Sequence, residues 1–169
     1  MKTARLALVF VFGASAAYGD DVDEIMDAAS DGIVVVSNVA GSVEVSGWSR
    51  NQVEVTGELG SRVEELIFER DGDEILIKVE VPRNNNGGIS SDLSINIPVA
   101  SSLQVNTVSA DIDVSDVEGE QELQSVSGDV ETEAHAADIE LSSVSGDVEV
   151  QGDRQNIRAR MNTVSGDVD

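Results

Sequence analysis

The stretch Thr163-Val-Ser-Gly-Asp-Val168 decides the fold, because near-copies of it recur through the second half of the chain. When the central valines of the strong copies are aligned, successive copies lie 18, 18 and 20 residues apart. This period is typical of one coil in a stacked architecture rather than of a domain. The other strong copies are Thr107 to Ile112, Ser125 to Val130 and Ser143 to Val148, and a weaker one is Asn38-Val-Ala-Gly-Ser-Val43.

Numbering each copy from its central valine, position 0, exposes a common pattern. Position −3 is always apolar, −5 mostly so, and two small polar residues precede the valine. Gly or Ala follows at +2, Ile or Val at +4, and +6 is apolar except for Thr132. The pattern predicts two short strands joined at a corner, with the valine at 0 and the residues at +2, +4 and +6 facing inward. Stacked copies then share one core, so we expect a β-solenoid with parallel, in-register strands.

Position +2 is Gly in four copies and Ala110 in the fifth. A backbone site that required positive φ would disfavour alanine, so the pattern indicates a need for a very small inward side chain. The rival interpretation is a Ser-Gly-Asp turn with its own left-handed glycine. It stays open at this point.

The rest of the chain also favours β structure. The sequence is 40% apolar but only 3% aromatic, and no helical spacing persists. Asp71-Gly72 between two apolar runs, 63–69 and 74–81, predicts a hairpin. Residues 82–92 are expected to form an exposed loop and residues 20–32 a flexible acidic lead-in. The expected fold is all-β: one solenoid domain over 33–169, with coils of about 18–20 residues preceded by a hairpin-containing β segment and strong repeats over 103–169.

Residues 1–19 have the features of a secretory signal peptide. Lys2 and Arg5 precede an apolar run from Leu6 to Phe12, and small residues lead to a cut after Gly19. The run is too short to span a membrane. We therefore expect export to the periplasm, the extracellular space or the cell surface, without membrane insertion after cleavage. The chain contains no cysteine, which excludes disulfides and a lipidated cysteine as anchors.

The mature chain is strongly acidic. Of 10 Lys and Arg, 2 lie in the signal peptide, which has no acid, so 8 remain against 33 Asp and Glu and the net charge is −25. Such a chain repels nucleic acid. Stacking places one aspartate above another at position +3, where exposed neighbours about 4.8 Å apart repel by about 1 kcal/mol. Salt screening, hydrogen bonds from Ser or backbone N–H groups, or divalent cations such as calcium could offset this repulsion, and we favour the first two. The candidate cation ligands are Asp111, Asp129, Asp147 and Asp167.

The sequence offers little for catalysis. His135 is the only histidine, and without cysteine there is no soft-metal cluster, so no resident cofactor is expected. No spacing supports a Ser-His-Asp triad. Trp48 is expected to fill the first turn rather than bind sugar. A polysaccharide-active enzyme would need a groove of aromatic and basic residues that this chain lacks, so we expect no enzyme.

The signal peptide, the Val39-Ala-Gly-Ser-Val43 segment before Trp48, the Asn-rich loop and the serial Val-Ser-Gly-Asp-Val copies together resemble the bacterial "putative adhesin" family of domains of unknown function. The resemblance implies an exported or envelope-associated β-solenoid and carries no catalytic residues. We therefore expect a structural or interaction module that binds an envelope protein or glycan, with an acidic cation-binding solenoid as the alternative. The sequence stops at Asp169 inside a copy, which favours a fragment of a longer chain over an end that self-associates through its sheet edge.

Overall fold

The computed structural model describes residues 20–83, 89–133, 135, 138–152 and 158–169. These residues form twelve strands and contain no helix. The predicted signal peptide and residues 84–88 of the predicted loop at 82–92 lie outside the described residues, and the last three residues of that loop, Ser90 to Asp92, belong to a strand. The strands are β1 (Asp20–Asp27), β2 (Ile33–Trp48), β3 (Gln52–Leu59), β4 (Glu65–Asp71), β5 (Glu74–Glu80), β6 (Ser90–Pro98), β7 (Ser102–Ser115), β8 (Gln121–Ser125), β9 (Val130–Glu133), β10 (Asp138–Ser145), β11 (Val148–Gln151) and β12 (Arg158–Ser165).

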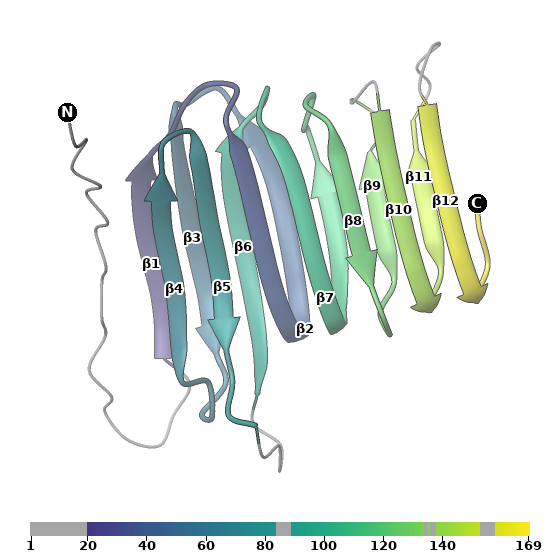
Figure 1. Ribbon diagram of the computed structural model, residues 1–169, viewed down its shortest axis with the longest axis horizontal. Coiled ribbons are helices and arrows are strands. Elements are labelled where there is room, and N and C mark those ends of the chain that lie inside the picture. The colour runs from purple at the N-terminus through teal and green to yellow at the C-terminus, as the bar shows by residue number, and fades with distance from the viewer. Residues whose placement is uncertain (1–19, 84–88, 134, 136–137, 153–157) are drawn as a thin grey trace, which may run out of the picture.

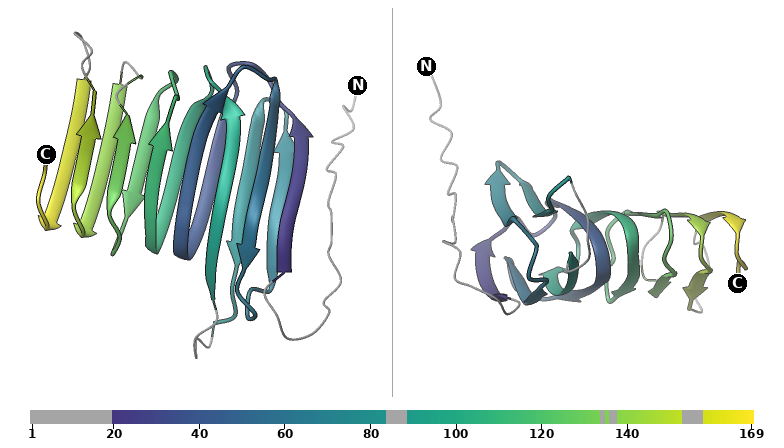
Figure 2. Two further views of the ribbon diagram at one scale, coloured as in Figure 1. Left: turned by 180° about the vertical axis from the view of Figure 1, so that it is seen from behind. Right: turned by 90° about the horizontal axis from the view of Figure 1, so that it is seen from below.

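The strands form two facing walls along a single stack (Figure 1). Wall A contains β4, β5, the first parts of β2 and β7, and then β8, β10 and β12. Wall B contains β1, β3, β6, the second parts of β2 and β7, and then β9 and β11. Each coil runs along wall A, turns a corner and returns along wall B. Figure 2 shows the coils side by side from β1 at one end to β12 at the other.

The coils stack in parallel and in register, as the repeat predicts. On wall A, Leu103 pairs with Gln121, Gln121 with Ile139, and Ile139 with Ala159. Between the walls lies one apolar core, built of Val, Ile and Leu side chains together with Phe68. The all-β solenoid is therefore confirmed.

The weak first copy does not stack where its place in the sequence suggests. β2 pairs along most of its length with β7, so Val36 lies beside Val105 although 69 residues separate them. The intervening strands lie on the other side of β2, where β5 pairs with its first part and β6 with its second part. The chain thus finishes one end of the stack before it returns and adds coils on the opposite side.

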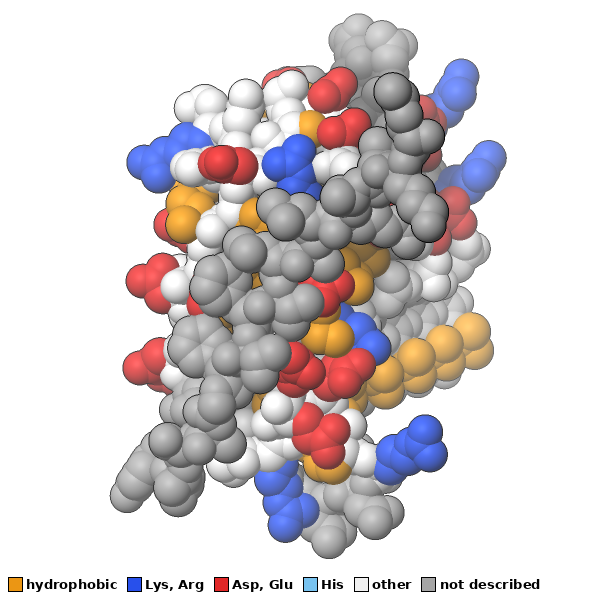
Figure 3. Space-filling view, turned by 60° about the vertical axis from the view of Figure 1, so that its left-hand side comes forward, with side chains coloured by type: hydrophobic (Ala, Val, Ile, Leu, Met, Phe, Trp, Pro, Cys, Tyr) orange, Lys and Arg blue, Asp and Glu red, His pale blue; other side chains and the backbone are white. Residues whose placement is uncertain are grey.

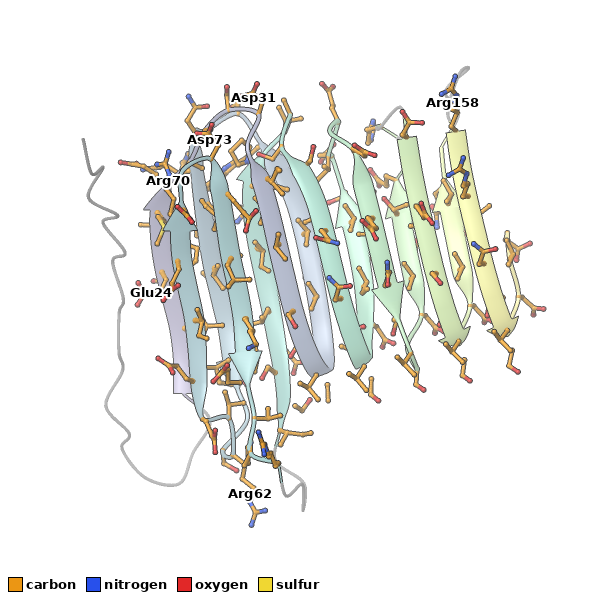
Figure 4. The ribbon with its side chains drawn as sticks, in the orientation of Figure 1. Glu24, Asp31, Arg62, Arg70, Asp73 and Arg158 are labelled. Atoms are coloured by element: carbon orange, nitrogen blue, oxygen red, sulfur yellow. The ribbon has the colours of Figure 1, made fainter. Side chains whose placement is uncertain are left out.

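The predicted hairpin is present as β4 and β5, which pair antiparallel from Glu65–Glu80 to Asp71–Glu74. Gly72 in its turn has φ 69°, which suits glycine. Arg70 donates one hydrogen bond to the Gly72 carbonyl over 2.7 Å and another to the Asp27 carbonyl at the end of β1 over 2.8 Å. Figure 4 shows Arg70 and Asp73 at this end of the molecule and Arg62 at the opposite end.

The expectation for residues 20–32 was wrong in its first part. Residues 20–27 form β1, which pairs antiparallel with β3 from Asp20–Leu59 to Asp27–Gln52. Met26 and Val22 pack against the core, so their weak alternation with acids was a real strand signal. The acids that suggested a flexible segment stand on an outermost strand, where charge discourages further pairing.

Candidate functional site

The corner of each coil is built on a buried polar residue at position −1. Thr107, Ser125 and Ser143 are buried there. Ser125 Oγ donates to the Ala110 carbonyl of the preceding coil over 3.4 Å, and Ser143 Oγ to the Gly128 carbonyl over 3.2 Å. The Thr163 hydroxyl donates likewise to the Gly146 carbonyl over 3.1 Å. Ser125, Ser143 and Thr163 thus join one coil to the preceding one, whereas Thr107 Oγ1 donates within its own coil, to the Ala110 carbonyl over 3.1 Å.

The central valines point outward, contrary to the expectation that they face the core. Val108, Val126 and Val144 are 46% to 50% exposed and Val164 is 79% exposed. The inward alternation of positions −5 and −3 continues to −1, and two outward residues, at 0 and +1, then make the corner before +2 turns inward again. Figure 3 shows a row of exposed hydrophobic side chains receding along the stack. The sequence did hold a signal for this: continuing the period-two alternation from −5 and −3 places position −1 inward and position 0 outward.

Position +2 is small because neighbouring coils approach closely. A Cβ on Gly128 would lie 2.2 Å from the Ala110 carbonyl oxygen, and one on Gly146 2.2 Å from the Gly128 carbonyl oxygen. Neither glycine is among the residues with positive φ. The first copy differs, since Gly41 has φ 112°. Close approach therefore explains the later copies, and the left-handed interpretation holds only for the first.

The aspartates at +3 form a hydrogen-bonded ladder along the outside of wall B. Oδ1 of Asp111 accepts the backbone N–H of Asp129 over 3.0 Å. Asp129 accepts in the same way from Asp147 over 2.9 Å, and Asp147 from Asp167 over 2.8 Å. The predicted capping by backbone N–H groups is thus present, and these charge-assisted bonds offset part of the repulsion between neighbours.

The row of +3 positions continues toward the other end of the stack with a serine in place of an aspartate. Ser42 stands at +3 in the first copy, and its hydroxyl donates to Oδ1 of Asp92 on β6 over 3.0 Å. Each rung of this row is thus bonded to a neighbouring rung by a side chain. The four candidate cation ligands lie on adjacent coils, and one carboxylate oxygen of Asp111, Asp129 and Asp147 already serves the backbone.

Within the described part of the chain, one group of three potential metal ligands converges, and it does not include the ladder. Asp116, Glu133 and His135 bring one ligand atom each within 4.8 Å of one another. His135 Nε2 lies 3.2 Å from Glu133 Oε2 and 3.9 Å from Asp116 Oδ1. No sequence pattern pointed to Asp116, because the group assembles from the ends of two successive coils. Both acids are exposed, so the three side chains form a cluster at the surface.

Trp48 stabilises the turn after β2, which is close to the expectation that it fills this turn. Its Nε1 donates to the Gln52 carbonyl over 2.7 Å. The Arg50 guanidinium lies 4.8 Å from the ring centroid, within cation–π range. The ring thereby bridges the two strands that the turn connects.

The family assignment rests on a match that covers β4 to β12. A family model described as Toastrack DUF4097 matches residues 61–169, which is more than half of the chain. The chain belongs to the Toastrack DUF4097 family. Comparison of the sequence with curated proteins found no match.

Solved structures share the fold at low sequence identity. A "putative cell adhesion protein" from Clostridium sporogenes has a TM-score of 0.66 and 9% identity, covering 88% of this chain and 98% of its own. A "putative adhesin" from Bacteroides fragilis has a TM-score of 0.54 and 11% identity, covering 88% of this chain and 79% of its own. At this identity the similarity concerns the solenoid architecture. No helix able to cross a membrane occurs among the residues described in this chain.

Proposed function

We propose that this protein is a non-catalytic, exported module of the cell envelope or the extracellular space whose solenoid surface binds another macromolecule in an adhesin-like way. The observation that carries the proposal is the row of exposed valines at position 0. Position 0 is Val in all five copies, and in the four strong copies this side chain is 46% to 79% exposed. An aligned row of exposed apolar side chains favours a surface that touches a partner.

The small glycines and the capping aspartates have structural roles, but the outward valines have none of comparable strength. Their β-branched shape suits a strand, and Ile or Thr would serve equally well there. The retention of Val at a half-exposed site is therefore better explained by contact with a partner. The solved neighbours described as adhesion proteins, together with the signal peptide predicted at residues 1–19, support an envelope setting.

The test is binding by the folded mature protein. Immobilised protein should retain an envelope protein or glycan from bacterial envelope extracts, in a manner that saturates and is competed by the free protein. Heat-unfolded protein of the same sequence is the control. Failure of correctly folded protein to retain any component would contradict the proposal, and turnover of envelope glycans by the pure protein would overturn its non-catalytic part.

Cation binding by the aspartate ladder is the second candidate, favoured by the alignment of four carboxylates on adjacent coils. Calcium would have to use the oxygens that the backbone does not engage. Calorimetric titration with calcium, and thermal melting with calcium or with chelator, decide the matter. The absence of both a heat of binding and a shift in Tm would eliminate this candidate.

A further inference from the structure

The outward residues at the corner and along wall B lie in parallel rows. The valine row is Val108, Val126, Val144 and Val164, and beside it runs a row of exposed serines at +1. The aspartate ladder follows at +3, and a second acidic row at +5. We call these rows together the corner face; its +1 and +5 members are Ser109, Ser127, Ser145, Ser165, Asp113, Glu131, Glu149 and Asp169.

The corner face combines an apolar stripe with uncompensated negative charge. The sequence contains no Lys or Arg from residue 84 to residue 153, so the first three rungs of the two acidic rows, from Asp111 to Glu149, lie on coils without a cationic side chain. The outside of wall A differs, because Asp138 and Glu140 pair in register with Arg158 and Arg160 on β12. The corner face should therefore attract a cationic group of a partner more strongly than wall A does, and it does so next to its exposed valines.

A second copy of this chain does not fit the corner face. Two such faces would bring acidic rows against acidic rows, on molecules that each carry a net charge of −23 in the full sequence. The occupant must instead carry basic groups beside apolar ones. Polypeptide segments of this kind are the amphipathic cationic helix and the alternating cationic strand.

The spacing of the rows favours the helix. Adjacent valines are separated by one strand spacing of about 4.8 Å. A helix lying along the row presents a side chain on one face about every 5.4 Å, which keeps it nearly in step over the four coils. An extended strand presents one about every 6.6 Å and falls out of step after two coils.

We propose that the corner face is the docking surface for a cationic amphipathic helix of a partner protein. The apolar stripe of the helix lies on the valine row, and its Lys and Arg side chains reach the aspartate ladder. This inference rests on the proposed function and names its surface and the chemistry of its partner. It does not depend on where the sequence ends, because Val108, Val126 and Val144 with their aspartates already form three complete rungs.

The probe is a synthetic helical peptide of five turns, with a leucine stripe flanked by lysines and a fluorescent label. Its Kd for the mature protein is measured by anisotropy at low and at physiological salt. A peptide of the same composition with leucines spread around the helix is the peptide control. We expect the amphipathic peptide to bind at least about tenfold more tightly than this control, and its affinity to fall as salt rises.

Paired variants assign the contact to the corner face. Val126→Ser with Val144→Ser should weaken binding about tenfold without lowering Tm, because these side chains are half-exposed. Asp129→Asn with Asp147→Asn should also weaken binding and flatten its salt dependence, and asparagine keeps the Oδ1 acceptor for the ladder. Glu122→Gln with Glu140→Gln makes the same charge change on wall A and should leave the Kd within about twofold.

The outcomes separate this inference from the proposed function. Equal loss in the wall A variant, or no loss in the valine variant, would show charge attraction alone and overturn the inference. The same holds if the amphipathic peptide does not bind better than its control. If the valine variant still retains the partner captured from envelope extracts, the interaction module stands and its docking surface lies elsewhere.

Discussion

Thr132 Oγ1 donates a hydrogen bond to Gln121 Oε1 over 2.6 Å, and both side chains are buried in the core. They are the polar exceptions at positions +6 and −5, and they fall in the same coil, one on each wall. Gln121 also donates from Nε2 to the Val117 carbonyl over 3.2 Å. A polar pair has thus replaced an apolar one without leaving the glutamine carbonyl or the threonine hydroxyl unpaired.

The Gln121–Thr132 pair should behave as a unit. Thr132→Val leaves the Gln121 carbonyl without its donor, and we expect the free energy of unfolding to fall by about 1–3 kcal/mol. Gln121→Leu should have a cost of the same order. The double variant restores an apolar pair, so its loss should be well below the sum of the two single losses. Urea unfolding of the four proteins measures the coupling, and strictly additive losses would contradict it.

The small residue at +2 should resist enlargement. Gly146→Ala places a Cβ 2.2 Å from the Gly128 carbonyl oxygen, and the coils must separate to admit it. We expect a loss of about 1–3 kcal/mol in the free energy of unfolding. Ala110→Gly is the matched control, because it removes a Cβ that the structure already holds, and its cost should be no more than about 1 kcal/mol. A harmless Gly146→Ala would show that the spacing of the coils is soft.

The aspartate ladder should distinguish charge from hydrogen bonding. Asp147→Ala removes the acceptor for the Asp167 N–H group and should lower the free energy of unfolding by about 1 kcal/mol. Asp147→Asn keeps an Oδ1 acceptor and removes like-charge repulsion, so at low salt it should be at least as stable as the wild type. Added salt should narrow the difference between Asn and wild type. An asparagine variant as unstable as the alanine variant would mean that the charge itself is needed.

The direction of the corner residues can be tested by substitution at adjacent positions. Val144→Thr changes an outward side chain and should shift the free energy of unfolding by no more than about 0.5 kcal/mol. Ser143→Ala removes the inward hydroxyl that donates to the Gly128 carbonyl and should lower it by about 1 kcal/mol. Leu141→Ala is the core reference, with an expected loss of about 2–5 kcal/mol. If Val144→Thr were as damaging as Leu141→Ala, the valine would face the core.

Most of the architecture could be predicted from residues that repeat. The 18-residue spacing indicated the coil, and the pairing of Leu103 with Gln121 and of Gln121 with Ile139 follows it. The Asp-Gly hairpin was a local turn signal and is found where expected. The aspartates of the candidate site were placed on one outward row, and their capping by backbone N–H groups was among the favoured explanations. The Asp116, Glu133 and His135 group could not be predicted, because it depends on how the ends of two successive coils meet.

The sequence by itself determined that the chain is a stack of β coils. The period-two alternation of apolar residues and the repeat of about 18 residues can both be read along the chain, whichever coils become neighbours. The tertiary structure decided three things for which the sequence held at most a weak signal: that β2 stacks on β7, that residues 20–27 join the sheet as β1, and that the central valines face outward. The valines face outward because the inward position at the corner goes to a side chain that can donate a hydrogen bond to a nearby carbonyl, and Ser or Thr can do so whereas Val cannot. The two strand pairings have another reason. Which coil is the neighbour is a long-range pairing that residue patterns do not specify.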